Sequence, residues 1–556
     1  MISEERICQN CKNDFTIEPD DFSFYEKIKV SPPTWCPDCR QQRRYAWRNE
    51  KVLYRRNCDL CGKSTVTIYS PDKPYKVYCL PCWWGDGWDM GEYGRDFDFS
   101  RPFFEQFAEL QRQVPRMALL NKNSQNSEYT NHSGENKNTY LSFSCFDDEN
   151  VMYSTWLQKS RDCMDSTYVY EKGERLYECT DCRSSYQCQY CVLVKDSSNC
   201  YYCYDCTGCS DCFLSSNLRS KRYVFKNKQC TKEEYLENVK NYNLASFTVR
   251  ENLNKEFEDL LLNTSIHKFM TGERNVVSKG NMLFNSKNAQ NAFDADKLED
   301  TKYMYSGLEI KDSMDLYHVG YKVELCYECH GCVRIYDTKF CHLCYDNSGI
   351  SYCDSCQNSQ NLFGCVSVKK GEYMIFNKKY SKEEYNELKN KIIEHMKQTG
   401  EYGEFFPPQI APVYYNETRG NFYVPMKKED VLAKGWHWED KIPGTFGKET
   451  ITIDQIPDTI QEVGDDMLKQ ILKCQNCTKN YNIVFDELAF YRQESIPLPR
   501  RCPTCRDDRR FALRQPRKLW HRKCMNESCT NAFETSYAPD RPEKVFCESC
   551  YQKEVY

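Results

Sequence analysis

The stretch "ECTDCRSSYQCQYCVLVKDSSNCYYCYDCTGCSDC", residues 178–212, carries all of its cysteines in one phase of a three-residue repeat. A second stretch, residues 326–365, follows the same rule, and there Cys329, Cys341 and Cys353 are evenly spaced, four triplets apart. A helix would drift out of this phase because it has about 3.6 residues per turn, and a strand would alternate at every second residue. The pattern therefore predicts a narrow parallel β-solenoid with about 12 residues per coil, in which one residue in three faces inward.

Positions of the same phase that hold no cysteine are mostly small or apolar, and Asn347 is the main exception. We expect these positions to face inward as well. Outside the two stretches they include Met164, Thr167, Tyr170, Met314, Tyr317 and Gly320. Three roles are open to the inward cysteines: core filler, cross-core disulfides, or a metal or cluster site. Core filler is favoured, because a thin coil has little room and a buried free cysteine acts as a small hydrophobic side chain.

The chain contains two nested duplications. Inside it, "RYVFKNKQCTKEEY" (222–235) matches "EYMIFNKKYSKEEY" (372–385), and "RDCMD" (161–165) matches "KDSMD" (311–315), both at an offset of 150 in the numbering. The tripeptide "YEC" recurs at the same offset. At the two ends, eight cysteines recur at an offset of 466, as in Cys8 and Cys474, which becomes 468 after a two-residue insertion. Such internal repeats indicate a fold built from repeated units.

These repeats predict five segments. They are a double zinc-binding module at 1–92, a solenoid with its capping helix at 93–250, a second one at 251–400, a linker at 401–472 and a second double zinc-binding module at 473–556. The predicted fold class is therefore mainly β, with two tandem Cys-rich β-solenoids capped by helices and flanked by small α+β zinc modules of the treble-clef or zinc-ribbon type.

Helices are expected where each solenoid ends. Thr231-x-x-Glu234 and Ser381-x-x-Glu384 are capping boxes at the start of helical patterns, and such helices would shield the open solenoid edge. Residues 98–120 and 251–265 are expected to form matching helices that open each solenoid. In the linker we expect a short helix near 427–434 that ends at Gly435, followed by two packing anchors, Trp436 and Trp438.

The terminal cysteines have the spacing of metal ligands. Their patterns are C-x2-C-x24-C-x2-C at each end, followed by C-x2-C-x17-C-x2-C or C-x4-C-x17-C-x2-C. Two close cysteines on a turn supply two ligands and a distant pair completes a tetrahedron. The predicted ligands are Cys8, Cys11, Cys36, Cys39, Cys58, Cys61, Cys79, Cys82, Cys474, Cys477, Cys502, Cys505, Cys524, Cys529, Cys547 and Cys550.

All-thiolate ligation suits zinc, so about four zinc ions per chain are expected, although iron is also compatible with such ligands. The alternative is that these cysteines are buried or joined in disulfides. Each module is too small to have its own core, so metal binding would supply much of its folding energy. No open coordination position is evident, and the sites are interpreted as structural rather than catalytic.

Two stretches resemble a known group of proteins. "CQNCKNDFTIEPDDFSFYEKIKVSPPTWCPDCRQQRR" and "CQNCTKNYNIVFDELAFYRQESIPLPRRCPTCRDDRR" are similar to the zinc-ribbon or treble-clef modules of uncharacterised bacterial Cys-rich proteins. The shared pattern is C-x-x-C, a Phe-Tyr pair, and then C-P-x-C-R with further arginines. The resemblance is specific over these two stretches and looser across the middle of the chain. It implies zinc binding and no established activity.

A run of arginines follows the second cysteine pair of each such module. In a treble clef a helix begins there, and one broad face of it would carry the arginines by i, i+3, i+4 spacing. The candidate nucleic-acid-binding residues are Arg40, Arg43, Arg44, Trp47, Arg48, Arg506, Arg509, Arg510 and Arg514. Arginine beside aromatic residues suits phosphate contact and base stacking, most plausibly with structured RNA. The alternatives are a solvated helix face, arginines bound to thiolates or to neighbouring acids, or a protein partner.

Composition limits the other possibilities. The chain has 556 residues, 36 cysteines and a formal net charge of −5, so any polyanion contact should be local to the basic patches. The start "MISEERICQN" has no apolar core, and no run is apolar enough to span a membrane. We therefore expect a cytoplasmic protein, since clustered cysteines in a reducing compartment more often bind metal or fill a core.

These observations favour a non-enzymatic zinc-binding scaffold or adaptor. A protein, RNA or ribonucleoprotein partner is expected, and a small-molecule substrate is not. No phosphate-binding loop, dinucleotide fingerprint or nucleophile elbow occurs in the sequence. The rival hypothesis is a metal or redox protein, or an enzyme, that uses the solenoid cysteines, for example at an iron–sulfur site.

Overall fold

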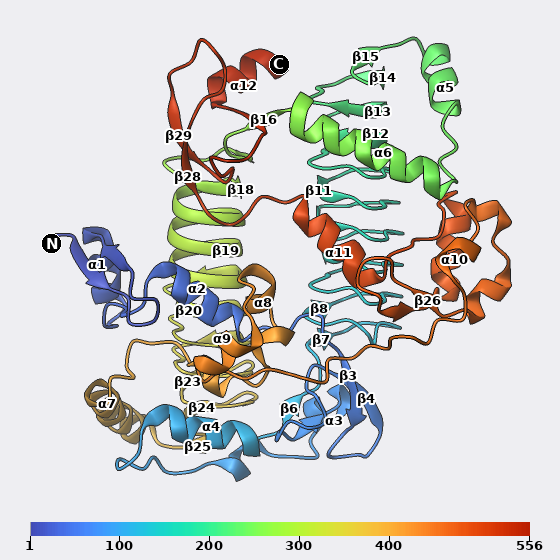
Figure 1. Cartoon of the computed structure of the whole chain (residues 1–556). Helices are drawn as coiled ribbons and strands as arrows, with labels where there is room; N and C mark the ends of the chain where they lie inside the picture. The colour runs from blue at the N-terminus through green and yellow to red at the C-terminus, as the bar shows by residue number, and fades with distance from the viewer. Residues whose placement is uncertain (1) are drawn as a thin grey trace. The chain divides into compact units, whose positions relative to one another are not determined.

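The computed structural model of the protein describes residues Ile2–Tyr556 (Figure 1). It is a mixed α/β structure with 25% helix and 31% strand, and its sheets are mostly parallel. Helices in the modules, caps and linker make the chain less strand-dominated than the predicted mainly-β class. Within Ile2–Tyr556, none of the helices has both the length and the apolar run that a bilayer crossing requires.

The chain forms two compact units, each assembled from segments that are far apart in the sequence. Unit 1 comprises Met1–Leu119, Met270–Ile442 and Arg517–Leu519, and unit 2 comprises Leu120–Phe269, Pro443–Pro516 and Trp520–Tyr556. Each unit thus combines one terminal module with one ladder of parallel strands. The order is crossed, because the N-terminal module belongs with the second ladder and the C-terminal module with the first. The five predicted segments stay a prediction.

The N-terminal module, in unit 1, contains two antiparallel hairpins and three helices, of which α2 and α3 begin at a cysteine. Its elements are β1 Glu4–Ile7, β2 Asp14–Ile17, α1 Pro19–Lys27, α2 Pro37–Tyr45, β3 Tyr54–Asn57, β4 Ser64–Thr67, β5 Val77–Tyr78 and α3 Leu80–Trp84. The expected helix at the second cysteine pair is α2, whose N-cap is Cys36.

The C-terminal module, in unit 2, repeats this order. Its elements are β26 Leu472–Lys473, β27 Asn480–Tyr481, α10 Phe485–Gln493, α11 Pro503–Ala512, β28 Trp520–Lys523, β29 Ala532–Thr535, β30 Lys544–Phe546 and α12 Glu548–Val555. Strand β30 pairs in parallel with β16 (Ile266–Lys268). In unit 1, β5 pairs in the same way with β6 (Arg116–Met117).

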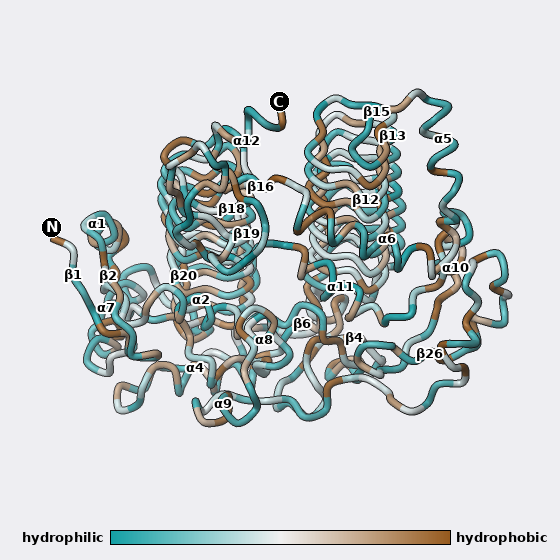
Figure 2. The backbone as a smooth tube through the Cα atoms, turned by 45° about the horizontal axis from the view of Figure 1, so that its top comes forward, coloured by the Kyte–Doolittle hydropathy of each residue, from teal (hydrophilic) through white to brown (hydrophobic). Residues whose placement is uncertain are grey.

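The first ladder, in unit 2, runs from residue 121 to residue 229 as a stack of turns (Figures 1 and 2). Its strands are β7 Asn121–Lys122, β8 Ser133–Gly134, β9 Thr155–Leu157, β10 Thr167–Tyr170, β11 Thr180–Arg183, β12 Ser198–Tyr204, β13 Ser210–Ser216, β14 Arg222–Phe225 and β15 Lys228–Gln229. Cys200 pairs with Cys212 in parallel, so the partners lie four triplets apart in the sequence. Only the last pair, β14 with β15, is antiparallel.

The second ladder, in unit 1, repeats this arrangement. Its strands are β17 Gly272–Glu273, β18 Gly280–Phe284, β19 Lys287–Glu324, β20 Tyr327–His330, β21 Val333–Tyr336, β22 Tyr345–Ser348, β23 Gln360–Phe363, β24 Glu372–Ile375 and β25 Lys378–Lys379. A straight strand with the 38 residues of β19 would be about 125 Å long. Figure 1 shows instead that β19 winds through several turns.

The winding arises from a left-handed residue in almost every triplet of the ladders. The residues that precede inward cysteines illustrate it: φ is +52° at Glu178, +54° at Asp181 and +54° at Phe340. Each left-handed residue bends the backbone, and residues four triplets apart pair in parallel. This conformation costs roughly 1–2 kcal/mol for a residue with a side chain. The hydrogen bonds between successive turns must therefore offset the conformational cost summed over all the left-handed residues.

The inward side chains bind the backbone of the next coil. The Cys179 thiol donates to the carbonyl oxygens of Tyr177, at 3.5 Å, and Cys188, at 3.3 Å. The Ser185 hydroxyl donates in the same way to the carbonyls of Arg183 and Val194. Asn347 makes an equivalent hydrogen bond, because its side-chain amide donates to the Cys356 carbonyl at 2.9 Å. All 36 cysteines are free thiols, and those in the ladder cores pack beside valine, leucine, isoleucine and alanine side chains.

Each ladder contains a coil that is lengthened by one extra residue. In the first ladder both Glu171 and Lys172 are left-handed, with φ of +57° and +64°. The pairing offset there grows by one, so that Met164 pairs with Tyr177. The second ladder repeats the insertion at the equivalent positions, Tyr321 and Lys322.

The insertion overturns part of the predicted inward phase. Met164, Met314 and Tyr317 are buried, but in clusters outside the ladder cores. The core of the first ladder instead contains the preceding residue Cys163, and that of the second contains Leu316. The extra residue shifts the inward phase by one. The phase of the cysteines that follow it therefore does not apply to the residues that precede it, and the prediction for those residues was wrong.

Helices close the ladders as predicted. Thr231 and Ser381 accept hydrogen bonds from the backbone of Glu234 and Glu384, and both capping boxes are complete. The helices that follow the ladders are α5 Lys232–Lys240 and α7 Lys382–Gln398. Helices α4 Phe103–Gln113 and α6 Phe247–Asp259 lie in the two stretches that were expected to open the ladders. That expectation was wrong, because α4 packs on the second ladder in unit 1 and α6 packs on the first ladder in unit 2. Helix α6 begins at Phe247, with Ser246 as its N-cap, and so it starts before the predicted residue 251.

The first part of the linker, up to Ile442, belongs to unit 1, and its aromatic residues pack there. Helix α9 (Lys428–Ala433) lies where a short helix was predicted, and Gly435 follows it with φ of +70°. Trp436 is buried against Tyr415, with ring centroids 5.2 Å apart. Trp438 packs on the same cluster and is partly buried, so both tryptophans act as packing anchors.

Candidate metal centres and the arginine contacts beside them

Four groups of four cysteines bring their sulfur atoms within 4.8 Å of one another. The groups are Cys8, Cys11, Cys36 and Cys39; Cys58, Cys61, Cys79 and Cys82; Cys474, Cys477, Cys502 and Cys505; and Cys524, Cys529, Cys547 and Cys550. They contain every cysteine selected from the sequence as a ligand. Across Ile2–Tyr556, these are the groups of three or more potential ligands close enough to hold a metal ion, and no cysteine of the ladder cores belongs to one.

The sulfur separations fit a tetrahedral metal site. Sγ of Cys11 lies 3.7 Å from Sγ of Cys36, and the corresponding distance between Cys61 and Cys79 is 3.9 Å. A tetrahedron with metal–sulfur bonds of about 2.3 Å has edges of about 3.8 Å. A disulfide would require about 2.05 Å. Each group could therefore hold one metal ion with four protein ligands, which leaves no coordination position for a substrate.

Local backbone structure prepares the thiols for metal binding. Cys8 closes the β1–β2 hairpin, where Lys12 is left-handed, and the backbone N–H of Cys36 donates to Sγ of Cys8 at 3.2 Å. Burial raises the pKa of Cys8, but backbone N–H groups of Cys11, Cys36 and Asn10 outweigh it and lower the pKa to about 6. A similar set of backbone donors lowers the pKa of Cys58 to about 6. Cys8 and Cys58 therefore favour the thiolate, the form that binds metal.

In unit 1, the arginines of α2 end on buried carboxylates of the second ladder. Arg40 and Arg44 both bind Asp315, with N–O distances of 2.8 and 2.9 Å. Arg44 also binds Glu328 at 2.6 Å, and Arg43 binds Glu328 at 2.7 Å. Arg43 makes a second pair at 2.6 Å with Glu404, a residue of the linker. The side chains of Asp315 and Glu328 are fully buried.

In unit 2, the arginines of α11 contact the first ladder in the same way. Arg506 and Arg510 both bind Asp165 at 3.0 Å. Arg509 binds Glu178 at 2.9 Å, and Arg510 lies 3.4 Å from the same carboxylate. Arg514 extends the contact beyond α11, because it binds Asp181 at 2.9 Å.

The two contacts are copies of each other. The arginines at 40, 43 and 44 correspond to those at 506, 509 and 510 by the offset of 466. Asp315 and Glu328 correspond to Asp165 and Glu178 by the offset of 150. In both copies the two carboxylates flank the lengthened coil. We call each set, three arginines of a module with the Asp and Glu of a ladder, an arginine clamp.

Most of the residues selected for nucleic-acid contact are therefore not on the surface. Trp47 is among the buried ones, and it stacks on Phe406 at a centroid distance of 5.0 Å. Arg509 and Arg514 are only partly buried. The contacts of the selected arginines match the alternative in which they bind neighbouring acidic residues. The fully buried members of the set are Arg40, Arg43, Arg44, Trp47, Arg48, Arg506 and Arg510.

The acidic partners of the arginines also have a sequence signal, because they lie in repeated motifs. Asp165 and Asp315 end the matched "RDCMD" and "KDSMD", and the glutamates of both clamps are the middle residues of the repeated "YEC". A separate buried group in unit 1 gave no such signal. There Asp354 binds Arg116 at 2.6 Å and His342 at 2.9 Å.

Comparison with known proteins adds little to this description. No family model and no curated protein matches the chain. One solved structure that does match is described as a putative acetyltransferase from Desulfovibrio desulfuricans G20, and it is 8% identical with a TM-score of 0.12. The match covers 46% of this chain and 66% of that one. A TM-score this low supports no argument about fold or function.

Proposed function

We propose that the chain is a non-enzymatic, zinc-stabilised scaffold or adaptor. The observation that carries the proposal is the arginine clamp, which attaches each module to a ladder through fully or nearly fully buried ion pairs. Removing one member of such a pair leaves an uncompensated buried charge. Each module therefore acts as a part of the folded body, and its metal sites would stabilise that part.

Zinc is the metal we propose for the four centres. All-thiolate tetrahedral sites suit zinc, and four protein ligands are typical of structural sites. Sites of this kind supply folding energy and perform no chemistry themselves.

We further propose that each ladder is a β-solenoid, in which the inward cysteines are core filler. The parallel register of four triplets and the thiol bonds to the next coil support this proposal. Repeat structures of this kind expose long, regular surfaces that can receive a partner.

An RNA or ribonucleoprotein partner stays a prediction. The selected arginines lend it no support, because direct phosphate contact requires exposed guanidinium groups and these are engaged with internal carboxylates.

Metal analysis of the purified chain tests the main proposal against its rival. About four zinc ions per chain with no visible absorption supports a structural role. Iron together with visible absorption would support the iron–sulfur alternative and overturn the proposal. Filter binding of structured RNA at low and high salt tests the partner, and an RNA-binding chain would lose affinity as salt rises.

A further inference from the structure

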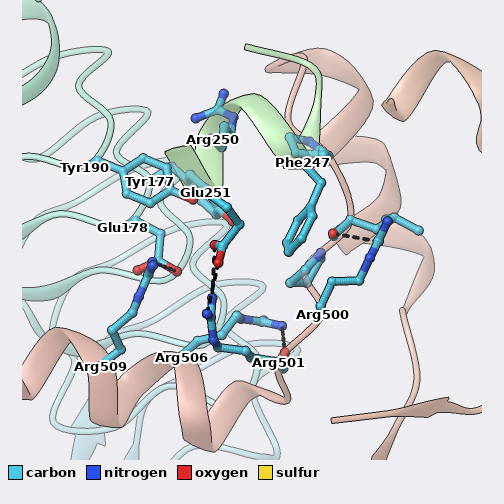
Figure 3. A pocket seen from close by; sticks show the side chains of 13 residues that line it. Tyr177, Glu178, Tyr190, Phe247, Arg250, Glu251, Arg500, Arg501, Arg506 and Arg509 are labelled. Carbon is cyan, nitrogen blue, oxygen red and sulfur yellow. Dashed lines mark hydrogen bonds and ion pairs between the residues drawn. The ribbon is translucent and has the colours of Figure 1, made fainter. Parts of the chain in front are cut away.

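Unit 2 contains a small pocket, with a cavity volume of about 30 Å³, that opens to solvent. It lies between the first ladder, the start of α6 and the segment that leads into α11 (Figure 3). Five arginines, two glutamates and three aromatic residues contribute to its lining. The charged lining residues therefore carry three more positive than negative charges.

Two of these arginines have no carboxylate partner among the described residues. Arg250 is held by the Leu244 carbonyl and the Gln189 amide oxygen, and its Nη1 is buried without a hydrogen-bond partner. Arg500 donates only to backbone carbonyls, among them that of Leu498. A buried cation without a counter-charge is costly, so an anion in the pocket would be stabilised.

The arginine clamp of unit 1 shows which group can lie beside the arginine that corresponds to Arg509. There Arg43 binds a second carboxylate, Glu404, at 2.6 Å. Glu404 also accepts hydrogen bonds from the backbone N–H of Thr34 at 3.0 Å and from its hydroxyl at 2.6 Å. The next two residues, Phe405 and Phe406, pack against Trp47. The arginine clamp of unit 1 is thus completed by an acidic peptide segment of the linker.

The clamp of unit 2 has no equivalent of this acidic segment. Arg509, the counterpart of Arg43, pairs with Glu178 alone among the described carboxylates, and its side chain is 27% exposed. The counterpart of Thr34 is Arg500, which adds a positive charge where unit 1 has a hydroxyl. At the rim, Arg501 and Glu251 form a partly exposed pair at 3.1 Å.

We propose that this pocket binds the carboxylate of an acidic side chain from a peptide segment of a partner protein. The carboxylate would lie beside Arg509 and Arg500, in the role that Glu404 has beside Arg43 and Thr34. Arg501 at the rim would add a third donor by exchanging Glu251 for the ligand. This inference goes beyond the scaffold role and does not depend on which metal the modules hold.

A labelled peptide with the sequence of residues 401–406, "EYGEFF", tests the proposal with the full chain. Fluorescence anisotropy should show saturable binding that weakens as salt rises. A peptide with Glu404→Gln should bind at least about tenfold more weakly, because it cannot form the charged pair. Succinate should compete with the peptide, and inorganic phosphate should compete much less.

Variants of the chain assign the binding to this pocket. Arg501→Gln should weaken peptide binding about tenfold, and Arg509→Lys should weaken it without leaving Glu178 unpaired. Arg334→Gln is the matched control, since Arg334 forms an exposed pair with Asp346 in unit 1. Circular dichroism melting would verify that each variant is folded. No saturable binding, equal binding by Arg501→Gln and Arg334→Gln, or equal competition by phosphate would each overturn the proposal.

Discussion

Arg44 of the N-terminal module lies 2.9 Å from Asp315 of the second ladder, although 271 residues separate them in the sequence. Arg510 and Asp165 repeat this pair at 3.0 Å between the C-terminal module and the first ladder. The duplicated ends of the chain are therefore explained by the duplicated middle. Each module has a matching ladder, and the two arginine clamps use equivalent residues.

The clamp should be essential to the stability of unit 1. Arg44→Met leaves Asp315 and Glu328 buried with too little positive charge, so we expect a loss of about 3–5 kcal/mol in the free energy of unfolding. Urea denaturation followed by tryptophan fluorescence would measure it. Arg334→Met is the control, because its exposed pair with Asp346 should contribute less than about 1 kcal/mol. Equal effects of the two substitutions would contradict this role of the clamp.

The number of bound metal ions should depend on how many of the four cysteine groups are intact. Cys39→Ser removes one ligand of the first group, so we expect the zinc content to fall from about four to about three ions per chain. Cys230→Ser is the control, since Cys230 lies outside all four groups and its loss should leave the metal content unchanged. A chelator should lower the melting temperature of the native chain, and a melting curve insensitive to chelation would argue against structural metal.

Acid should weaken unit 1 through its buried carboxylates. Burial raises the pKa of Asp315, but Arg40 and Arg44 outweigh it and lower the pKa below its usual value. The pKa of Glu404 is also lowered, because Arg43 and Thr34 outweigh burial. Such groups stabilise the fold above their unfolded pKa of about 4 and lose that contribution as pH falls through the folded value.

The measurement is the free energy of unfolding from about pH 7 down to about pH 3, and tryptophan fluorescence reports mainly on unit 1. Metal release also occurs in acid, since protons compete for thiolates. Asp315→Asn separates the two effects: the variant should be less stable at neutral pH and should lose less stability on acidification. An identical acid profile for both proteins would show that metal release alone controls the transition.

The inward cysteines should tolerate serine better than leucine. The Cys341 thiol donates to the carbonyl oxygen of Lys339 at 3.2 Å, and a serine hydroxyl can replace that donor, as Ser185 does in the first ladder. We expect Cys341→Ser to cost about 1 kcal/mol. Cys341→Leu overfills a thin core and should cost a further 1–3 kcal/mol, roughly. Thermal unfolding of the two variants tests this order, and a leucine variant as stable as the serine variant would contradict the core-filler role.

The sequence was most informative where the spacing of one residue type reflects the geometry of the fold. The cysteine pairs identified the four groups, because two ligand pairs must meet around one ion. The three-residue phase predicted the parallel register of four triplets, and the capping boxes predicted the starts of α5 and α7. Each of these patterns is set by contacts that repeat at a fixed distance along the chain.

Single, non-repeating features were harder to predict. The extra residue at Glu171–Lys172 shifts the inward phase by one. Among the cysteines of the first ladder, its trace is that Cys145 and Cys163 are out of phase with Cys179. The partners of the arginines are 271 residues away for Arg44, so local patterns could not distinguish a surface patch from a buried clamp. Glu404 was missed for the same reason, since it completes the clamp from the linker.

The crossed order of modules and ladders has a consequence for synthesis of the protein. Arg40 is made 275 residues before Asp315, so at about 5–20 residues per second the first module waits roughly 14–55 s for its partner. The first ladder likewise waits for Arg506 and Arg510, which are made after both ladders. Unit 2 cannot be completed before its C-terminal module is made, and we expect the first ladder of the nascent chain to expose unpaired charges until then.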